Sequence, residues 1–160
     1  MERGRILYDN TKALVQEMRA AGIEHRCDTP EDDTNVFDTV RVGWQGRRLP
    51  RTTILIRVND RGAHLETLPL GEVDPACRAR ALEEVNALNV EYRWLKLAIG
   101  ESGELVCSSD VFLVPEVAGL FGIAAMGRMF DALDEMYPRF VGLLRWRAAA
   151  LGKPLHVGIG

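Results

Sequence analysis

The sequence predicts an α+β fold in which helices pack on one face of an antiparallel sheet. Apolar and polar residues alternate with a period of two in several runs, which is typical of strands with one buried face. Helical periodicity is confined to the beginning, the middle and the end of the chain, so the expected order is α-β-β-β(-β)-α-β-β-α. Strands and helices do not alternate one by one, which argues against a parallel doubly wound sheet.

Composition fits one domain spanning residues 1–160. The chain has 160 residues and 47% of them are apolar, which is enough for a real core. The formal charge of -3 and the pI near 5.7 argue against non-specific nucleic-acid binding and against a polybasic membrane anchor. We therefore expect neither a nucleic-acid partner nor a membrane partner.

The cysteines and the N-terminus indicate a cytoplasmic protein. Cys27, Cys77 and Cys107 are odd in number and widely spaced, so they do not form a disulfide framework and reduced thiols are the simpler interpretation. The first ten residues have no apolar stretch of signal-peptide length, and no run approaches the roughly 20 apolar residues of a membrane span.

The first half of the chain predicts one helix and an antiparallel meander. A helix over Leu7–Ala21 has an apolar stripe and ends before Gly22, where a left-handed residue commonly closes a helix. The polar segment 29–35 predicts a loop, and 45–51 and 59–62 predict connections between strands. The expected strands are 24–29, 36–44, 54–58 and 63–70.

The second half predicts two helices around a hairpin. Asp74 can cap a helix whose first position suits Pro75, and that helix should end near Asn89. Strands over 92–99 and 105–113 follow, joined by a turn at 101–104. A long helix is expected over 116–151, kinked or divided by Pro138, because proline loses a hydrogen bond and clashes one turn back.

No residue pattern predicts catalysis, a cofactor or a metal. His25, His64 and His156 lack the spacing of metal ligands, and a packed or exposed pair is the preferred interpretation of His25 and Cys27. The glycines at 122 and 127 have the spacing of a phosphate-binding loop, but Arg128 follows where that motif needs lysine. We interpret these glycines as positions where a helix approaches the sheet closely.

Three polar clusters are interpreted as solvated or structural. The acidic cluster 31–33 lacks the spaced ligands and central glycine of a calcium loop. Arg47, Arg48 and Arg51 predict a solvated hairpin tip in preference to a grip on an acidic peptide or phosphate. Asn86 and Asn89 lie one turn apart at a helix end, where their amides can satisfy free carbonyls or tie the helix to the next strand.

The stretch from Val85 to Leu113 resembles the YbjN-like family, labelled as candidate bacterial sensory transduction regulators. The resemblance is carried by N-x-x-N at the helix end, an aromatic and lysine-bearing strand, the ESGE turn and a strand ending in Ser-Asp. It is clearest over residues 81–146. That family is similar in fold to type III secretion chaperones, which are small α/β sandwiches that commonly dimerise and bind peptide segments. The resemblance implies a bacterial protein and transfers no catalytic residue, and the apolar segment 114–127 departs from the family pattern.

The function we expect is a non-catalytic interaction module, chaperone-like or regulatory, which binds a polypeptide partner and forms a homodimer. Large apolar residues on strands with one open face are the partner-binding candidates, although each can instead belong to the core. These candidates are Val42, Trp44, Ile56, Trp94 and Phe112. A dedicated type III secretion chaperone is the first alternative. A small-molecule-binding or cryptically enzymatic domain is the second, and it requires a deep pocket with converging polar groups.

Overall fold

The computed structural model describes residues 8–28 and 36–147, with three α-helices and an eight-stranded sheet within them. The helices are α1 (Asp9–Ala20), α2 (Arg78–Glu91) and α3 (Ala118–Phe140), with short 3₁₀ turns η1 (Pro75–Cys77) and η2 (Val141–Leu143). The strands are β1 (Arg26–Asp28), β2 (Asp38–Trp44), β3 (Thr52–Val58), β4 (Gly62–Thr67), β5 (Gly71–Val73), β6 (Lys96–Ile99), β7 (Glu104–Phe112) and β8 (Leu144–Arg147). The expected helix start at residue 7, the loop and acidic cluster within 29–35, the helical residues 148–151 and His156 lie outside the described residues.

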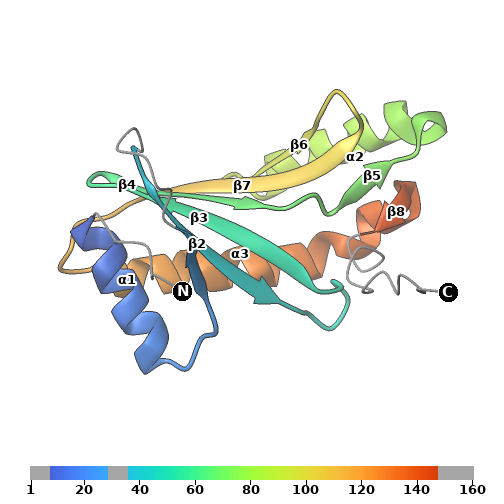
Figure 1. Cartoon of the computed structure of the whole chain (residues 1–160). Helices are drawn as coiled ribbons and strands as arrows, with labels where there is room; N and C mark the ends of the chain where they lie inside the picture. The colour runs from blue at the N-terminus through green and yellow to red at the C-terminus, as the bar shows by residue number, and fades with distance from the viewer. Residues whose placement is uncertain (1–7, 29–35, 148–160) are drawn as a thin grey trace, which may run out of the picture.

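The sheet is antiparallel throughout its described pairs, in the order β1-β2-β3-β4-β7-β5-β8, with β6 also paired to β7 (Figure 1). The long strand β7 holds the sheet together, because its second half pairs with β4 while its first residues pair with β5. The α+β fold class with an antiparallel sheet is confirmed.

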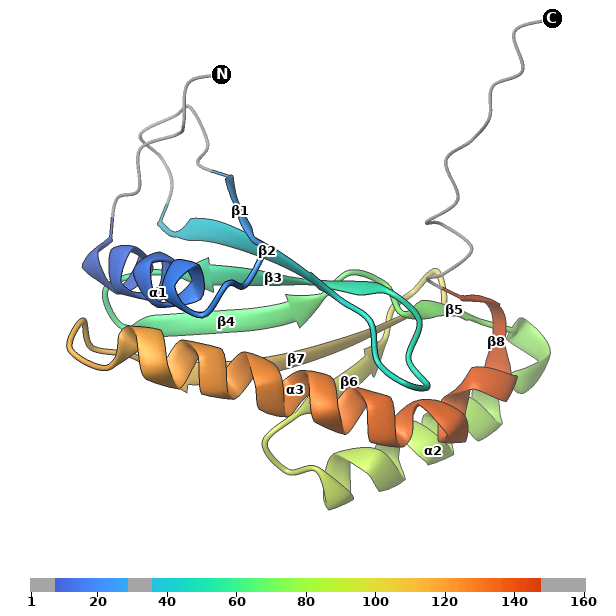
Figure 2. The same cartoon turned by 90° about the horizontal axis from the view of Figure 1, so that it is seen from below.

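Helices α1 and α3 cover one face of the sheet, and α2 lies beside the β6 edge (Figure 2). Alternation along the strands produces this layering. In β3, Ile54, Ile56 and Val58 are fully buried beneath the helices, whereas Leu55 and Arg57 between them are only half-buried. The core therefore lies between the sheet and the α1–α3 layer.

Two glycines of α3 allow the helices to pack closely. A Cβ on Gly119 would lie 2.7 Å from the Cβ of Glu17, and one on Gly122 would lie 2.6 Å from a methyl of Leu14. The close approach expected at Gly122 is therefore present, but its partner is α1 and not the sheet. At Gly127 the expectation was wrong, because a Cβ there would have no neighbour within 4 Å. Because Gly122 lies inside a helix and not in a loop, it does not cradle a phosphate through free backbone N–H groups.

The expectation of a final helix reaching residue 151 was wrong. Helix α3 ends at Phe140, and Leu144–Arg147 form strand β8, which pairs with β5. Pro138 lies in the last turn of α3 and does not divide it, since the hydrogen bond that proline lacks is lost only at the helix end. Strand pairing with a distant segment overrides the local helical pattern here.

Two strand boundaries also differ from expectation. The strand expected over 63–70 ends at Thr67, and a separate β5 follows at Gly71, with an irregular register between Glu72 and Val73. The strand expected from Tyr92 begins only at Lys96, because residues 92–95 form a turn closed by a 2.9 Å hydrogen bond from the Leu95 N–H to the Tyr92 carbonyl. Among the described helices, none combines the length and the apolar content needed to span a membrane.

Candidate functional site

The face of the sheet opposite α1 and α3 carries no helix within residues 8–28 and 36–147 (Figure 1). The register of the central strands aligns one row of side chains across this face. Arg57 on β3 pairs with His64 on β4, which pairs with Asp110 on β7. We call this surface the open face.

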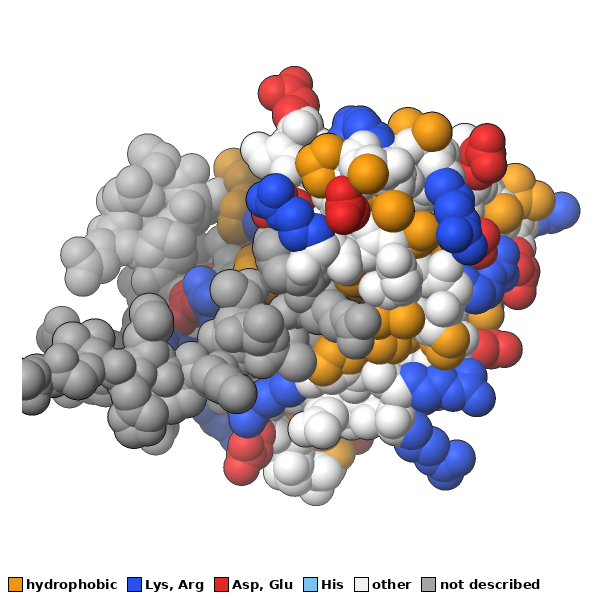
Figure 3. Space-filling model, turned by 90° about the vertical axis from the view of Figure 1, so that its right-hand side faces the viewer, with side chains coloured by type: hydrophobic (Ala, Val, Ile, Leu, Met, Phe, Trp, Pro, Cys, Tyr) orange, Lys and Arg blue, Asp and Glu red, His pale blue; other side chains and the backbone are white. Residues whose placement is uncertain are grey.

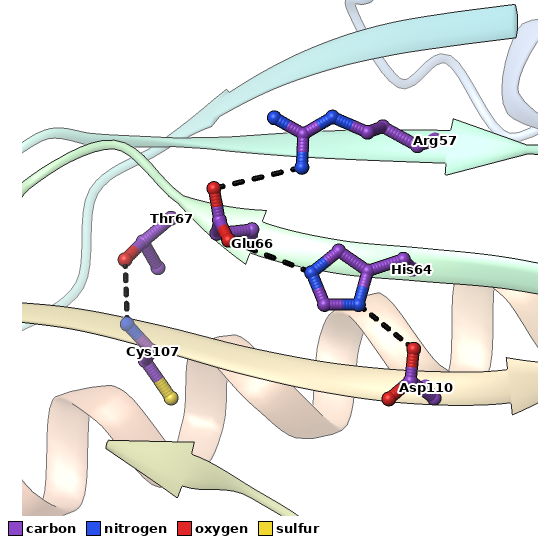
Figure 4. A network of polar contacts seen from close by, with 6 residues as sticks. All are labelled: Arg57, His64, Glu66, Thr67, Cys107 and Asp110. Atoms are coloured by element: carbon purple, nitrogen blue, oxygen red, sulfur yellow. Dashed lines mark hydrogen bonds and ion pairs between the residues drawn. The ribbon is translucent and has the colours of Figure 1, made fainter. Parts of the chain in front are cut away.

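A polar network joins three strands of the open face (Figure 4). The Nδ1 atom of His64 lies 2.8 Å from Oδ1 of Asp110, and its Nε2 atom lies 3.5 Å from Oε2 of Glu66. The other carboxylate oxygen of Glu66 lies 3.6 Å from the Arg57 guanidinium. These side chains keep about a third of their area or more in contact with solvent, so the network fixes their positions without burying them.

A groove of about 550 Å³ runs beside this network. Its walls include Phe37, Arg57, His64 and Phe112, and the Arg57 guanidinium lies 5.8 Å from the centre of the Phe37 ring. Phe112 is 92% exposed, the highest exposure among the large hydrophobic side chains of the described residues. An aromatic ring left in water beside fixed charges is a feature of partner-binding surfaces.

The imidazole of His64 is poorly arranged for proton transfer to a substrate. A catalytic base needs a ring nitrogen directed at the reacting group and a nucleophile or substrate within reach. Here both ring nitrogens face carboxylates, one from Asp110 and one from Glu66. The two carboxylates orient the imidazole ring on the open face.

Burial makes two of the three thiols, those of Cys107 and Cys27, poor nucleophiles. Burial raises the pKa of the Cys107 thiol to about 12, although a hydrogen bond from the Ser108 backbone opposes the shift. Burial likewise raises the pKa of Cys27, with a smaller opposing effect of Arg19. Because the thiolate is the reactive form, neither cysteine is poised for covalent chemistry.

Nothing in the described residues gathers the side chains of a metal site. No group of three or more His, Cys, Asp and Glu side chains lies close enough together to hold an ion. His25, which shares a segment with Cys27, instead places its Nδ1 atom 2.8 Å from the carbonyl oxygen of Ile23.

The five partner-binding candidates are distributed over different environments. Val42 and Ile56 are 3% and 0% exposed, so they belong to the core under the helices and are not on the open face. Trp44 is half-buried and stacks on Phe130 with ring centres 4.7 Å apart. Trp94 is half-buried beneath the guanidinium of Arg128, which lies 3.9 Å from its ring centre. Phe112 is the one candidate of the five that lies on the open face.

Asn89 ties α2 to the sheet, as the sequence indicated. Its amide nitrogen donates to the carbonyl of Leu97 at 3.0 Å, and its amide oxygen accepts from the Leu97 N–H at 2.7 Å. Asn86 is exposed at the surface of α2. The side-chain amide of Asn89 thus occupies backbone groups of β6 that point away from β7.

The arginine-rich hairpin tip is held by α3. The carboxylate of Asp134 accepts hydrogen bonds from the backbone N–H groups of Arg48 and Leu49, each at 2.8 Å. Desolvation alone would raise the pKa of Asp134, but these hydrogen bonds and the charge of Arg48 outweigh it and lower the pKa. Arg47 and Arg48 are themselves exposed, as the sequence indicated for a solvated tip.

Four residues of the open face were absent from the sequence-based candidates, namely Phe37, Arg57, His64 and Asp110. The sequence did indicate this surface, because residues that alternate with buried ones along a strand face the opposite side of the sheet. On β3, Arg57 lies between the buried residues Ile56 and Val58. The contact between His64 and Asp110 joins residues 46 positions apart and depends on the β4–β7 register.

Comparison with known proteins supports a relationship at the level of fold. No family model matches the chain, and no curated protein matches it. One solved structure does match, that of YbjN from E. coli, described as a candidate transcription regulator. The alignment has a TM-score of 0.54 and 14% sequence identity, and it covers 84% of this chain and 94% of that chain. The chain has a YbjN-like fold. At this identity, the likeness describes the YbjN-like arrangement of helices and strands and carries no site residue across.

Proposed function

We propose that this chain is a non-catalytic interaction module that binds a polypeptide partner through the groove of the open face. The observation that carries the proposal is the exposed ring of Phe112 beside a groove of about 550 Å³. The YbjN-like fold is compatible with a regulatory or interaction role, because YbjN is itself described as a candidate transcription regulator.

The chemistry of the groove suits a polypeptide. Burying a Phe side chain contributes about 1.5–3 kcal/mol, and aromatic residues with arginine dominate binding hot spots. Phe112 and Phe37 offer apolar surface, while Arg57 and Asp110 offer charges of both signs within the same groove. A peptide can satisfy all of these groups at once, since its side chains and backbone combine apolar and polar contacts.

Strand addition at β6 is a less favourable mode of binding. Strand addition needs free backbone N–H and C=O groups along a sheet edge. The amide of Asn89 already satisfies both groups of Leu97 on the outer side of β6. We therefore propose docking across the open face in preference to pairing along that edge.

The absence of an enzymatic role is part of the proposal. The ring nitrogens of His64 face carboxylates, and burial keeps Cys107 protonated near neutral pH. We also propose a cytoplasmic location, which the free thiols at 27, 77 and 107 support.

Site-specific photo-crosslinking tests the proposed function. A photoreactive phenylalanine analogue is introduced at position 112 in cells of the source organism, and adducts are identified by mass spectrometry. The matched control carries the same group at Val90 on α2, which is 71% exposed. We expect a polypeptide adduct at position 112 that is absent at position 90, and its loss when Arg57→Glu is added. Adducts of equal yield at both positions, or none at position 112, would refute a partner site on this face.

The identity of the crosslinked molecule distinguishes between the alternative functions. One exported protein as the dominant adduct would favour a dedicated type III secretion chaperone. An adduct of twice the chain mass would show that the open face contacts a second copy. A folded protein with no polypeptide adduct would shift the function to small-molecule binding.

We further propose that the chain forms a homodimer. The exposed apolar side chains of Leu82 on α2 and of Leu120 and Phe121 on α3 support this. At the end of the molecule where α2 lies, hydrophobic groups are interspersed with acidic and basic side chains (Figure 3). Because the described part of that surface has no continuous apolar area, we propose that the first half of α3 forms the dimer interface. Light scattering at micromolar concentration should give the dimer mass, and a Leu120→Glu variant should give the monomer mass.

A further inference from the structure

A second hollow lies between the outer edge of β2 and the middle of α3. Its volume is about 400 Å³ and its walls are mostly apolar. They are formed by Val42, Trp44, Ile123, Met126 and Phe130. We call this hollow the Trp44 cleft. It lies on the helix-covered side of the sheet, so it is separate from the groove beside Phe112.

The walls of the cleft are closely packed and its mouth is open. Trp44 stacks on Phe130 at an interplanar angle of 25°, and Met126 and Phe130 are almost completely buried. Gly127 contributes no side chain at the mouth, and a Cβ built there has no neighbour within 4 Å. The cleft is therefore a preformed apolar site with room at Gly127.

A backbone edge borders the cleft. The backbone carbonyl of Thr53 accepts a hydrogen bond from the Leu68 N–H, so the backbone N–H and C=O groups of Thr53 are directed toward β4. The backbone groups of its two neighbours on β3 are therefore directed toward β2. In the β2–β3 register Gly43 is opposite Thr53, so the backbone groups of Gly43 point outward. Strand β1 pairs with β2 only as far as Arg41, which leaves Gly43 beyond the last described pair.

The rim of the cleft is acidic. Glu24 and Asp131 both line it and both are exposed. Neither carboxylate takes part in an ion pair among residues 8–28 and 36–147. An apolar pocket with two uncompensated carboxylates at its mouth is complementary to an apolar group that carries a positive charge close by.

We propose that the Trp44 cleft binds an extended segment of a partner polypeptide that has an apolar residue and a lysine or arginine two positions apart. In an extended chain, residues two positions apart point to the same side. The apolar side chain then packs against Trp44 and Met126, the basic one meets Glu24 or Asp131, and the segment backbone faces Gly43. This inference rests on the proposed role as a polypeptide-binding module, but it concerns a different surface and a defined sequence pattern.

A pair of synthetic peptides tests the proposal. The first is a fluorescently labelled octapeptide made of two Leu-Ser-Lys-Ser repeats. The second is identical except that glutamate replaces each lysine. Binding is measured by fluorescence anisotropy with the full chain at low ionic strength. We expect saturable binding of the lysine peptide and at least about tenfold weaker binding of the glutamate peptide.

Variants place the binding in the cleft. Gly127→Leu fills the mouth while improving helix propensity, so we expect it to fold and to lose binding. Asp131→Lys should weaken binding about tenfold, because an attraction becomes a repulsion. Glu83→Lys, an equal charge change on the exposed side of α2, and Phe112→Ala on the open face should leave binding unchanged.

Three outcomes would overturn the proposal. They are no binding of the lysine peptide, equal binding of both peptides, and full binding by folded Gly127→Leu. If any of these occurs while crosslinking at position 112 succeeds, the Trp44 cleft is not a site and the open-face function stands. If the peptide binds as expected and crosslinking at position 112 fails, the cleft stands and the open face loses its role.

Discussion

The side-chain amide of Asn89 forms two hydrogen bonds with the backbone of Leu97, one in each direction. It makes the contacts that a neighbouring strand would make with β6. Helix α2 thereby anchors one edge of the sheet and withdraws the backbone groups of Leu97 from other partners. A single residue at the end of a helix serves both purposes.

Replacing Asn89 by alanine should lower the free energy of unfolding by about 1–3 kcal/mol, because two hydrogen bonds worth roughly 0.5–1.5 kcal/mol each are lost. Asn86→Ala, on the exposed surface of the same helix, should change it by less than about 0.5 kcal/mol. Urea denaturation of the two variants measures the difference. Equal effects of the two substitutions would contradict the role assigned to Asn89.

Asp134→Asn should make the protein less sensitive to acid. Hydrogen bonds from Arg48 and Leu49 outweigh desolvation and lower the pKa of Asp134, so its carboxylate stabilises the fold above the ordinary pKa of aspartate. That stabilisation is lost as the pH falls through the lowered pKa. The difference in unfolding free energy between wild type and Asp134→Asn should thus be largest near pH 7 and shrink toward pH 3. Asp131→Asn, one turn away and exposed, is the matched control.

Two glycines of α3 should respond to alanine with opposite signs. Gly127→Ala should stabilise the protein by about 0.5–1 kcal/mol, because nothing obstructs the added Cβ and alanine favours the helix. Gly119→Ala should destabilise it by roughly 1–3 kcal/mol, since its Cβ would meet the Cβ of Glu17 and the backbone oxygen of Ala13. Thermal unfolding followed by circular dichroism measures both. A stabilising Gly119→Ala would show that α1 and α3 do not pack as closely as described.

Cys107 should resist thiol reagents in the native protein. With its pKa raised by burial to about 12, roughly one thiol in ten thousand is ionised at pH 8. Modification should therefore follow global unfolding and accelerate in denaturant. Peptide mapping by mass spectrometry after pulses of iodoacetamide resolves Cys107 from Cys77, which is partly exposed and should react first. Early modification of Cys107 in native buffer would argue against its burial.

The alternation of apolar and polar residues predicted the central strands, because in each of them it indicates which side chains are buried. Val40 and Val42 on β2, and Ile54 and Ile56 on β3, alternate with polar or less buried residues, and all four are in the core. Strand β8 gave no such evidence. Its residues continue the apolar pattern of α3, and they become a strand only through pairing with β5, far earlier in the chain.

The candidate surface was less accessible to sequence reasoning than the fold. Val42, Ile56 and Phe112 are all large apolar residues on strands, yet the first two are buried and the third is exposed. The helices decide which face is covered, and that packing is not encoded in the alternation of any one strand. The pairing of His64 with Asp110 likewise requires the register between β4 and β7.

Strand β3 has one face in the core and one face outside it, and this has an evolutionary consequence. Ile54, Ile56 and Val58 hold the fold, whereas the residues between them face outward and contribute little to the core. Substitutions at the outward positions therefore cost little core packing, and on the proposed function they change the surface that meets a partner. On that proposal, changing every second residue of one strand would be enough to exchange one partner for another.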